Sequence, residues 1–336
     1  MRYPESTRVD HVDTYHGVEI ADPYRWLEDL DSPETAAWVR AQNEVTMPYL
    51  EAIPQRDAIR TRITELWDYE RLSPPFHRGD RWFLLRNDGL QNQAVVYALD
   101  SADADAERRV LLDPNQWAAD GTVSLAGFVL DDDATHAAFG VSKAGSDWNE
   151  WRVLDVATAT ETGDVLEWVK FTSAEWLPDG SGFFYGRYDE PTGDALEETN
   201  YFQKLYLHRV GTPQSDDVLV YERRDEKEWM FDATATEDEA YLIVHVSLGT
   251  DPRNAVFYRP LADASAPFVE LLREFDALYH VLGNDGSRLY LRTDRDAPKG
   301  RVVAIDLERP NALVELVPED DAALVSASIV GDALLL

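Results

Sequence analysis

Hydrophobic and polar residues follow two different patterns along this chain, and the change falls at Pro74-Pro75. Across residues 1–72, apolar residues recur every three or four positions, which is typical of amphipathic helices. The segment Ser32-Pro33-Glu34 predicts a helix start, because a hydroxyl N-cap, an early proline and an acid near the helix dipole all favour one. A second helix is predicted from Pro54, with one apolar face made by Ile59, Ile63, Leu66 and Trp67.

After Pro75 the pattern changes to short apolar or aromatic runs separated by Asp, Gly, Asn and Pro. Because no long amphipathic pattern interrupts these runs, the region is predicted to be all β. The clearest predicted strands are 82–85, 94–99, 137–141, 183–185, 241–246 and 289–291.

The β region also repeats. A polar turn followed by an apolar strand recurs at residues 80, 133, 179, 238 and 285, in steps of 53, 46, 59 and 47 residues. A period near fifty residues with several strands in each period is typical of a β-propeller. A further turn at Gly331-Asp332 is expected to open a sixth blade. Residues 73–336 are therefore predicted to form about five blades plus a stub, and the sequence looks truncated because a propeller must close its ring.

Composition excludes several classes of function. The chain has 31 Lys and Arg against 64 Asp and Glu, a formal net charge of −33, so it would repel nucleic acids and anionic membranes. It has no cysteine, which excludes disulfides, thiolate metal sites and thiol catalysis. We find no secretory signal and no apolar run long enough for a membrane helix, so a cytoplasmic location is expected.

The acidity has two possible explanations. Only five of the basic residues are lysines. A surface with many hydrated carboxylates and few lysine side chains is typical of halophilic proteins, because high salt screens the repulsion among the carboxylates. The alternative is an ordinary acidic protein from a GC-rich genome, where Arg is favoured over Lys. We favour salt adaptation.

A collinear series of motifs resembles one peptidase family. The motifs are DPYRWLED at 22–29, LWDY at 66–69, NDGLQNQ at 87–93, LDPN at 112–115, GSDW at 145–148, VKF at 169–171, QKLY at 203–206 and GTD at 249–251. Together they resemble the prolyl oligopeptidase (prolyl endopeptidase) family, serine peptidases that cut short peptides after proline. DPYRWLED alone also fits the related oligopeptidase B, but NDGLQNQ and GSDW favour the prolyl enzymes.

The resemblance implies a fold and a set of partners. In this family a seven-bladed propeller is inserted into an α/β-hydrolase domain and caps its active site. Residues 1–72 resemble the N-terminal helical segment of the hydrolase domain, and residues 73–336 resemble the first blades. The remaining hydrolase part would be the partner of this chain, short proline-containing peptides its ligands, and the full-length protein a monomer without a cofactor.

The resemblance also places substrate contacts on three residues of the propeller. They are Phe171 in VKF, Met230 in Trp229-Met230, and Thr250 in GTD. An aromatic ring and a thioether would form an apolar wall for a hydrophobic group of the peptide. Threonine at position 250, where some relatives have cysteine, leaves a smaller polar edge.

The chemistry of a serine peptidase is missing from this sequence. None of the fifteen serines has glycine at both −2 and +2, as the G-x-S-x-G nucleophile turn requires. The serine that comes nearest to this pattern, Ser142, is expected to be a turn serine at a blade edge. In the family, the Ser/Asp/His triad lies beyond the region that corresponds to residue 336. The histidines are scattered, and Asp103, Asp105 and Glu107 lack the remaining ligands of a calcium loop, so no metal site is predicted.

Two functions remain open at this point. The first is the N-terminal part of a prolyl oligopeptidase-like serine endopeptidase, which is inactive alone but carries the propeller that admits substrate. The alternative is a non-catalytic propeller that binds peptide or protein partners. A downstream reading frame with G-x-S-x-G would favour the enzyme, and no sequence feature favours a structural protein.

Overall fold

The computed structural model describes residues 2–103, 105–193, 199–331 and 333–336. The chain divides into two compact units, residues 1–69 and 70–336. The sequence pattern placed this boundary after residue 72. The difference arises because strand β3 (Arg71–Leu72) already pairs with β5 (Arg81–Asn87) of the second unit.

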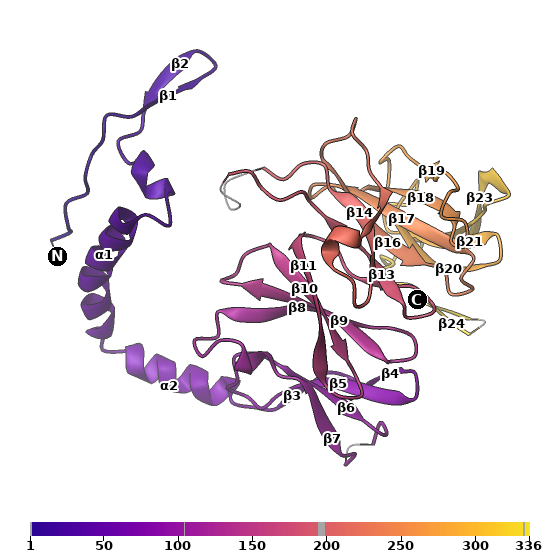
Figure 1. The fold of residues 1–336 in the computed structure, drawn as a ribbon, viewed down its shortest axis with the longest axis horizontal. Helices are drawn as coiled ribbons and strands as arrows, with labels where there is room; N and C mark the ends of the chain where they lie inside the picture. The colour runs from indigo at the N-terminus through magenta and orange to yellow at the C-terminus, as the bar shows by residue number, and fades with distance from the viewer. Residues whose placement is uncertain (1, 104, 194–198, 332) are drawn as a thin grey trace. The chain divides into compact units, whose positions relative to one another are not determined.

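Two helices form the main part of the first unit, as the sequence predicted (Figure 1). Helix α1 (Pro33–Glu51) begins at the predicted start, where the Ser32 hydroxyl oxygen accepts a hydrogen bond from the Thr35 amide at 3.1 Å. Helix α2 spans Arg56–Trp67, and a short 3-10 helix, η1, spans Arg25–Glu28.

The first unit also contains a β-hairpin, so the helical prediction is wrong for residues 12–21. Strands β1 (Val12–Tyr15) and β2 (Val18–Ala21) pair antiparallel. His16 and Gly17, which connect them, have φ of +51° and +82°, the left-handed backbone that a two-residue hairpin turn requires. Strands of four residues are too short to show a β period within a helical pattern.

The apolar face predicted on α2 lies in contact with water. Ile59, Ile63, Leu66 and Trp67 are each between 55 and 59% exposed. Burying one such side chain fully is worth about 1.5–3 kcal/mol. This face therefore favours packing against another element.

The second unit is a series of antiparallel sheets that follow one another in chain order (Figure 1). The described residues form five blades of at least four strands and a two-stranded sixth sheet. The first blade contains β3, β4 (Phe76–Arg78), β5, β6 (Val95–Leu99) and β7 (Arg108–Leu112). The second contains β8 (Val123–Leu130), β9 (His136–Lys143), β10 (Asn149–Asp155) and β11 (Thr160–Val169).

The later blades have the same consecutive order. The third contains β12 (Glu175–Trp176), β13 (Gly182–Arg187), β14 (Lys204–Arg209) and β15 (Val218–Tyr221). The fourth contains β16 (Trp229–Ala235), β17 (Tyr241–Leu248), β18 (Asn254–Pro260) and β19 (Val269–Leu272). The fifth contains β20 (Tyr279–Asp285), β21 (Arg288–Thr293), β22 (Arg301–Asp306) and β23 (Arg309–Val317), and the sixth sheet β24 (Ser328–Val330) and β25 (Ala333–Leu335). Two further 3-10 helices are η2 (Pro114–Gln116) and η3 (Gln214–Asp216).

The repeated turns precede the second strand of each four-stranded blade and the third strand, β5, of the five-stranded first blade. The strands that follow them are β5, β9, β13, β17 and β21. Every strand predicted above coincides with an observed strand, except that β6 begins at Val95, one residue later than predicted. The turn that begins at Gly331 likewise precedes β25, which pairs with β24. Strand β24 thus precedes this turn, so the expectation that the turn opens the sixth blade was wrong.

A hydrophobic cluster lies between each pair of consecutive complete blades. Successive residues of a strand point to opposite faces, so a blade inside the stack needs apolar residues on both. On β17, Leu242 and Val244 pack in the cluster shared with the third blade, whereas Ile243 packs in the cluster shared with the fifth. The largest fully buried side chains of the four clusters include Phe83, Phe139, Phe183, Tyr185, Phe231, Phe257 and Tyr279.

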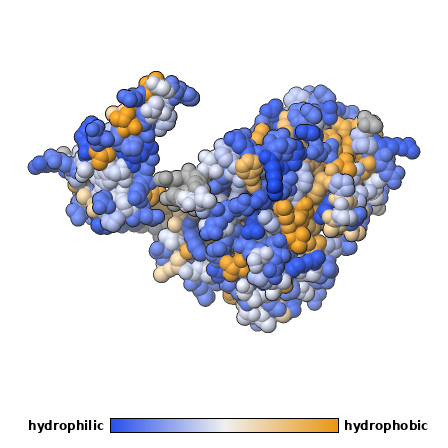
Figure 2. Space-filling view, turned by 45° about the horizontal axis from the view of Figure 1, so that its top comes forward, coloured by the Kyte–Doolittle hydropathy of each residue, from blue (hydrophilic) through white to orange (hydrophobic). Residues whose placement is uncertain are grey.

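Hydrophilic residues cover most of the face drawn in Figure 2, and apolar residues gather there in patches. Among the described residues, Asp131 and Asp164 are the acidic residues that are buried, so most of the acidic side chains lie at least partly at the surface. Among the described helices, none has the length and apolar character needed to cross a membrane.

Candidate functional site

One cavity of the second unit brings together the three residues for which substrate contact was predicted. Phe171, Met230 and Thr250 all line a cavity of about 620 Å³. They come from the loop after β11, from β16 and from the turn after β17. The other lining residues are Tyr188, Thr199, Asn200, Tyr201, Glu228, Leu248 and Gly249. A mostly apolar lining with a few polar groups is typical of small-ligand sites, and the substrate contact itself stays a prediction.

Phe171 adopts an unusual backbone conformation in the wall of this cavity. Its φ is +54°, in the left-handed region that costs a bulky residue on the order of 1 kcal/mol or more. Its side chain is 59% exposed. The left-handed backbone is unfavourable for phenylalanine, and the exposed ring gains little from burial. Contacts made by neighbouring residues must therefore hold Phe171 in this conformation.

The Gln203 side chain is one of these neighbours. Its Nε2 donates to the carbonyl oxygen of Lys170 at 2.9 Å, directly before Phe171. Its Oε1 accepts a hydrogen bond from the amide of Phe231 at 2.6 Å, directly after Met230. One buried amide thus joins the loop that carries Phe171 to the strand that carries Met230.

The Asp232 carboxylate makes a second connection between the same two segments. Its Oδ1 accepts hydrogen bonds from the Thr172 hydroxyl and the Ser173 amide, both at 3.2 Å. Burial raises the pKa of Asp232, although the hydrogen bonds from Ser173 and Thr172 lower it. Phe171 is therefore held from both sides along the chain.

Aromatic rings and a cation contact two of the residues that line the cavity, Tyr188 and Asn200. The Lys170 ammonium lies 4.0 Å from the centre of the Trp148 ring and donates to Asn200 Oδ1 at 2.7 Å. Burial lowers the pKa of Lys170. Trp148 packs edge-to-face on Trp168 and on Tyr188, with ring centres 5.6 and 5.9 Å apart. Burial raises the pKa of Tyr188 to about 12, so its hydroxyl stays protonated at neutral pH.

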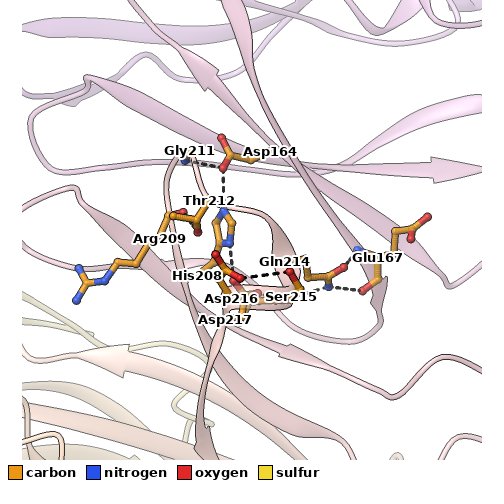
Figure 3. A network of polar contacts seen from close by, with 11 residues as sticks. Asp164, Glu167, His208, Arg209, Gly211, Thr212, Gln214, Ser215, Asp216 and Asp217 are labelled. Atoms are coloured by element: carbon orange, nitrogen blue, oxygen red, sulfur yellow. Dashed lines mark hydrogen bonds and ion pairs between the residues drawn. The ribbon is translucent and has the colours of Figure 1, made fainter.

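A fully buried histidine anchors β11, the strand that leads into Phe171. His208 Nδ1 lies 2.7 Å from Asp217 Oδ1, and its Nε2 lies 3.0 Å from Asp164 Oδ1 (Figure 3). Because carboxylates only accept, both ring nitrogens donate, and the imidazole carries a positive charge. Burial opposes this charge, but the hydrogen bonds to Asp217 and then to Asp164 raise the pKa of His208.

Further hydrogen bonds extend this connection between the second and third blades. Gln214 Nε2 donates to the Glu167 carbonyl at 3.1 Å, and the Glu167 amide donates to Gln214 Oε1 at 3.2 Å (Figure 3). The Gly211 amide donates to Asp164 Oδ1 at 2.6 Å. The end of β11 is thus fixed to the third blade directly before the cavity.

A second cavity, of about 390 Å³, is lined by residues of all five complete blades and contains Glu175. The Ala235 amide donates to Glu175 Oε1 at 2.7 Å. Burial raises the pKa of Glu175 to about 7, although the hydrogen bond from Ala235 lowers it. The negative charges of Asp232 and Asp132 raise the pKa further. This carboxyl therefore changes its charge near neutral pH.

Ser142 and Asp103, which the sequence excluded as a nucleophile and as a calcium ligand, each form a hydrogen bond with a nearby residue. Ser142 lies within β9, which pairs with both β8 and β10, so the expectation of a turn serine at a blade edge was wrong. Its hydroxyl donates to the Ser146 carbonyl at 2.8 Å. Residue 104, inside the rejected calcium loop, is outside the described residues, and Asp103 Oδ2 accepts from the Ser101 hydroxyl at 3.0 Å. Within the described part of the chain, no three His, Asp or Glu side chains are placed to hold a metal ion.

Sequence reasoning missed most of the cavity. Tyr188, Asn200, Tyr201 and Glu228 line it but stand outside the three predicted positions. Gln203 was noted only as the first residue of the QKLY motif, and Asp232 was not noted. A buried glutamine has no local signal, because its partners belong to other blades.

Known proteins match this chain over nearly its whole length. The family model for the prolyl oligopeptidase N-terminal β-propeller domain matches residues 4–336. A prolyl endopeptidase of Elizabethkingia meningoseptica is 38% identical over 313 residues, which cover 93% of this chain and 44% of that protein. Prolyl oligopeptidase A of Amanita bisporigera is 34% identical, over 96% of this chain and 47% of that protein.

Solved structures match in the same way. Prolyl oligopeptidase B of Galerina marginata, bound to a 25mer macrocyclization substrate, has a TM-score of 0.84 at 28% identity. The match covers 97% of this chain and 49% of that chain. A structure from a study of two prolyl endopeptidases has a TM-score of 0.72 at 33% identity, over 99% of this chain and 48% of that one. The chain thus spans about half the length of the relatives it matches.

Proposed function

The chain belongs to the prolyl oligopeptidase family, and on that premise we propose that it provides the substrate-admitting propeller of a serine endopeptidase that cleaves short peptides after proline. One observation carries the proposal: Phe171, Met230 and Thr250 line a single cavity of about 620 Å³. An aromatic ring and a thioether in one wall suit an apolar side chain of a peptide. The Phe171 ring is 59% exposed in the wall of this cavity, so it is accessible to such a side chain.

The nucleophile would come from a hydrolase part that packs against the first unit. Two features support this part of the proposal. The sequence has no G-x-S-x-G motif. The apolar face of α2, made by Ile59, Ile63, Leu66 and Trp67, is more than half exposed and would gain free energy by burial.

A complementation experiment tests the proposed function. The 336-residue chain is assayed on a chromogenic proline peptide, first alone and then fused to the part of a prolyl endopeptidase relative that lies beyond the matched region. We expect no hydrolysis from the chain alone and cleavage after proline from the fusion. Hydrolysis by the purified chain that survives Ser142→Ala would contradict the proposal. A folded fusion that binds the peptide without cleaving it would favour a non-catalytic binding propeller.

We further propose that this protein works in a salt-rich cytoplasm. The support is compositional: a formal net charge of −33 and only five lysines. Repulsion among surface carboxylates is screened at high ionic strength, so such a surface costs least stability there.

A further inference from the structure

A buried glutamine connects the segments that carry two of the predicted contact residues, although it does not line the cavity itself. Gln203 is 1% exposed and lies directly before β14 in the third blade. Its amide donates to the Lys170 carbonyl at 2.9 Å and accepts from the Phe231 amide at 2.6 Å. These two backbone groups belong to the connection after the second blade and to the fourth blade. One side chain of the third blade therefore links the connection after the second blade to the fourth blade.

The position requires both a donor and an acceptor. Only a carboxamide offers an N–H and an oxygen at this separation in every protonation state, whereas a carboxylate can only accept. Removing the donor would leave the Lys170 carbonyl, which is part-buried, without this hydrogen bond and would destabilise its loop.

The surroundings fit closely around this amide. A Cβ added at Gly186 would lie 2.9 Å from the Phe231 carbonyl oxygen and 3.1 Å from Gln203 Cδ. The Gly186 amide also donates to the Thr172 hydroxyl at 3.0 Å. Glycine thus makes room for the Gln203 side chain next to the segment that carries Phe171.

We infer that Gln203 is a positioning residue, which fixes Phe171 and Met230 at the spacing that an apolar peptide side chain requires. The inference rests on the proposed function of the cavity. Phe171 has a left-handed backbone at φ +54°, and the hydrogen bond at the Lys170 carbonyl is one of the contacts that hold it there. Without that bond the loop relaxes toward an ordinary backbone, and the ring leaves its place in the wall.

The first test measures peptide selectivity in the full chain. The probes are two fluorescent proline peptides, one with Phe and one with Gly two positions before the proline. We expect the wild type to bind the Phe peptide roughly tenfold more tightly, as apolar pockets discriminate. Gln203→Glu at pH 8 and Gly186→Ala should bring the ratio of the two dissociation constants close to one.

A matched control separates positioning from loss of stability. Asn115, in η2 after the first blade, makes the same kind of paired contact: Nδ2 donates to the Gln93 carbonyl at 3.0 Å, and Oδ1 accepts from the Gln93 amide at 2.9 Å. Its Nδ2 also donates to Asp113 Oδ1 at 2.9 Å. Asn115→Asp removes the donor there, as Gln203→Glu does in the third blade. We expect Asn115→Asp to lower the melting temperature but to leave the peptide ratio unchanged.

A second readout needs no peptide. The chain has three methionines, Met1, Met47 and Met230, so methyl-labelled protein gives three methionine signals in NMR. Gln203→Glu should shift the Met230 signal at pH 8 and leave the Met47 signal in place. At low pH the carboxyl introduced by Gln203→Glu is protonated and can again donate to the Lys170 carbonyl, so the Met230 signal should move back toward its wild-type position.

The outcomes distinguish this inference from the proposed function. A wild type that binds both peptides equally would refute the proposed function, and this inference with it. A wild type that prefers the Phe peptide, together with a Gln203→Glu variant that prefers it equally, would overturn this inference alone. An unmoved Met230 signal in Gln203→Glu would also overturn it.

Discussion

Replacing Glu175 with glutamine should stabilise this protein at alkaline pH. Glu175 lies on β12, the first strand of the third blade, and its Oε1 accepts a hydrogen bond from the Ala235 amide at 2.7 Å. Burial raises the pKa of this carboxyl to about 7. Glutamine keeps the accepting oxygen and removes the charge, so Glu175→Gln isolates the cost of ionisation.

The size and sign of the effect follow from that pKa. The ordinary value is 4.5 and the value in the folded state is about 7, and one pKa unit is worth 1.36 kcal/mol, so ionised Glu175 costs about 3 kcal/mol. Because the folded state binds this proton more tightly, the stability that Glu175 contributes is fully present below pH 4.5 and is lost as the pH rises through about 7. The variant should exceed the wild type by less than about 1 kcal/mol near pH 5 and by about 3 kcal/mol at pH 8.

Urea unfolding followed by tryptophan fluorescence, at pH 5 and at pH 8 in the same salt, measures this difference. Glu308→Gln is the matched control, because Glu308 is exposed. The control should change the free energy of unfolding by less than about 0.5 kcal/mol at both pH values. A Glu175→Gln variant that is no more stable than the wild type at pH 8 would refute the reasoning, and so would a gain that is equal at both pH values.

Three further predictions concern the blade connection, the salt response and the first unit. His208→Gln leaves two buried carboxylates without their cation, and should cost about 3–5 kcal/mol in urea unfolding below pH 6.5. Since the pKa of His208 is raised, the wild type loses this stability as the pH rises through that raised value. If His208→Gln instead lowers the free energy of unfolding by the same amount up to about pH 10, the imidazole is not charged in the folded protein. The melting temperature should rise substantially between dilute buffer and about 1 M KCl, where the Debye length is about 3 Å; a melting temperature indifferent to KCl would leave genome composition as the explanation of the acidity. Ile63→Ser combined with Leu66→Ser should lower the binding of an apolar dye while changing stability by less than about 1 kcal/mol, because both side chains are already more than half exposed; a large loss of stability would show that α2 packs within this chain.

Local chemistry accounts for the parts of the fold that the sequence predicted. The start of α1 depends on Ser32 and its near neighbour Thr35, and both are visible in a short window. The blades were predictable for the same reason, since each repeat is marked by a polar turn directly before one of its strands. The hairpin at 12–21 was missed because its strands have four residues each, too few to establish a period.

The candidate site depends on contacts that no local window contains. Gln203 bonds to residues 33 and 28 positions away, and the Thr172 hydroxyl donates to Asp232 across 60 positions. Phe171, Met230 and Thr250 were identified only through the resemblance, because each alone looks like an ordinary strand-end or core residue. These residues line one cavity because consecutive blades stack on one another. A repeating sequence pattern predicts the stacking, but it does not specify which loops of neighbouring blades come together.

Steady-state kinetics of Phe171→Ala in the fusion with a hydrolase part tests the central claim, that this cavity contacts the substrate, most directly. Phe202→Ala is the matched control, because Phe202 is also an exposed aromatic residue with a left-handed backbone, φ +60°, but is not among the residues that line the cavity. We predict that Phe171→Ala raises KM roughly tenfold for a peptide with an apolar residue two positions before proline and leaves kcat within about twofold, since a contact made equally in ground and transition states affects binding alone. An unchanged KM in Phe171→Ala, or an equal rise in Phe202→Ala, would contradict the account.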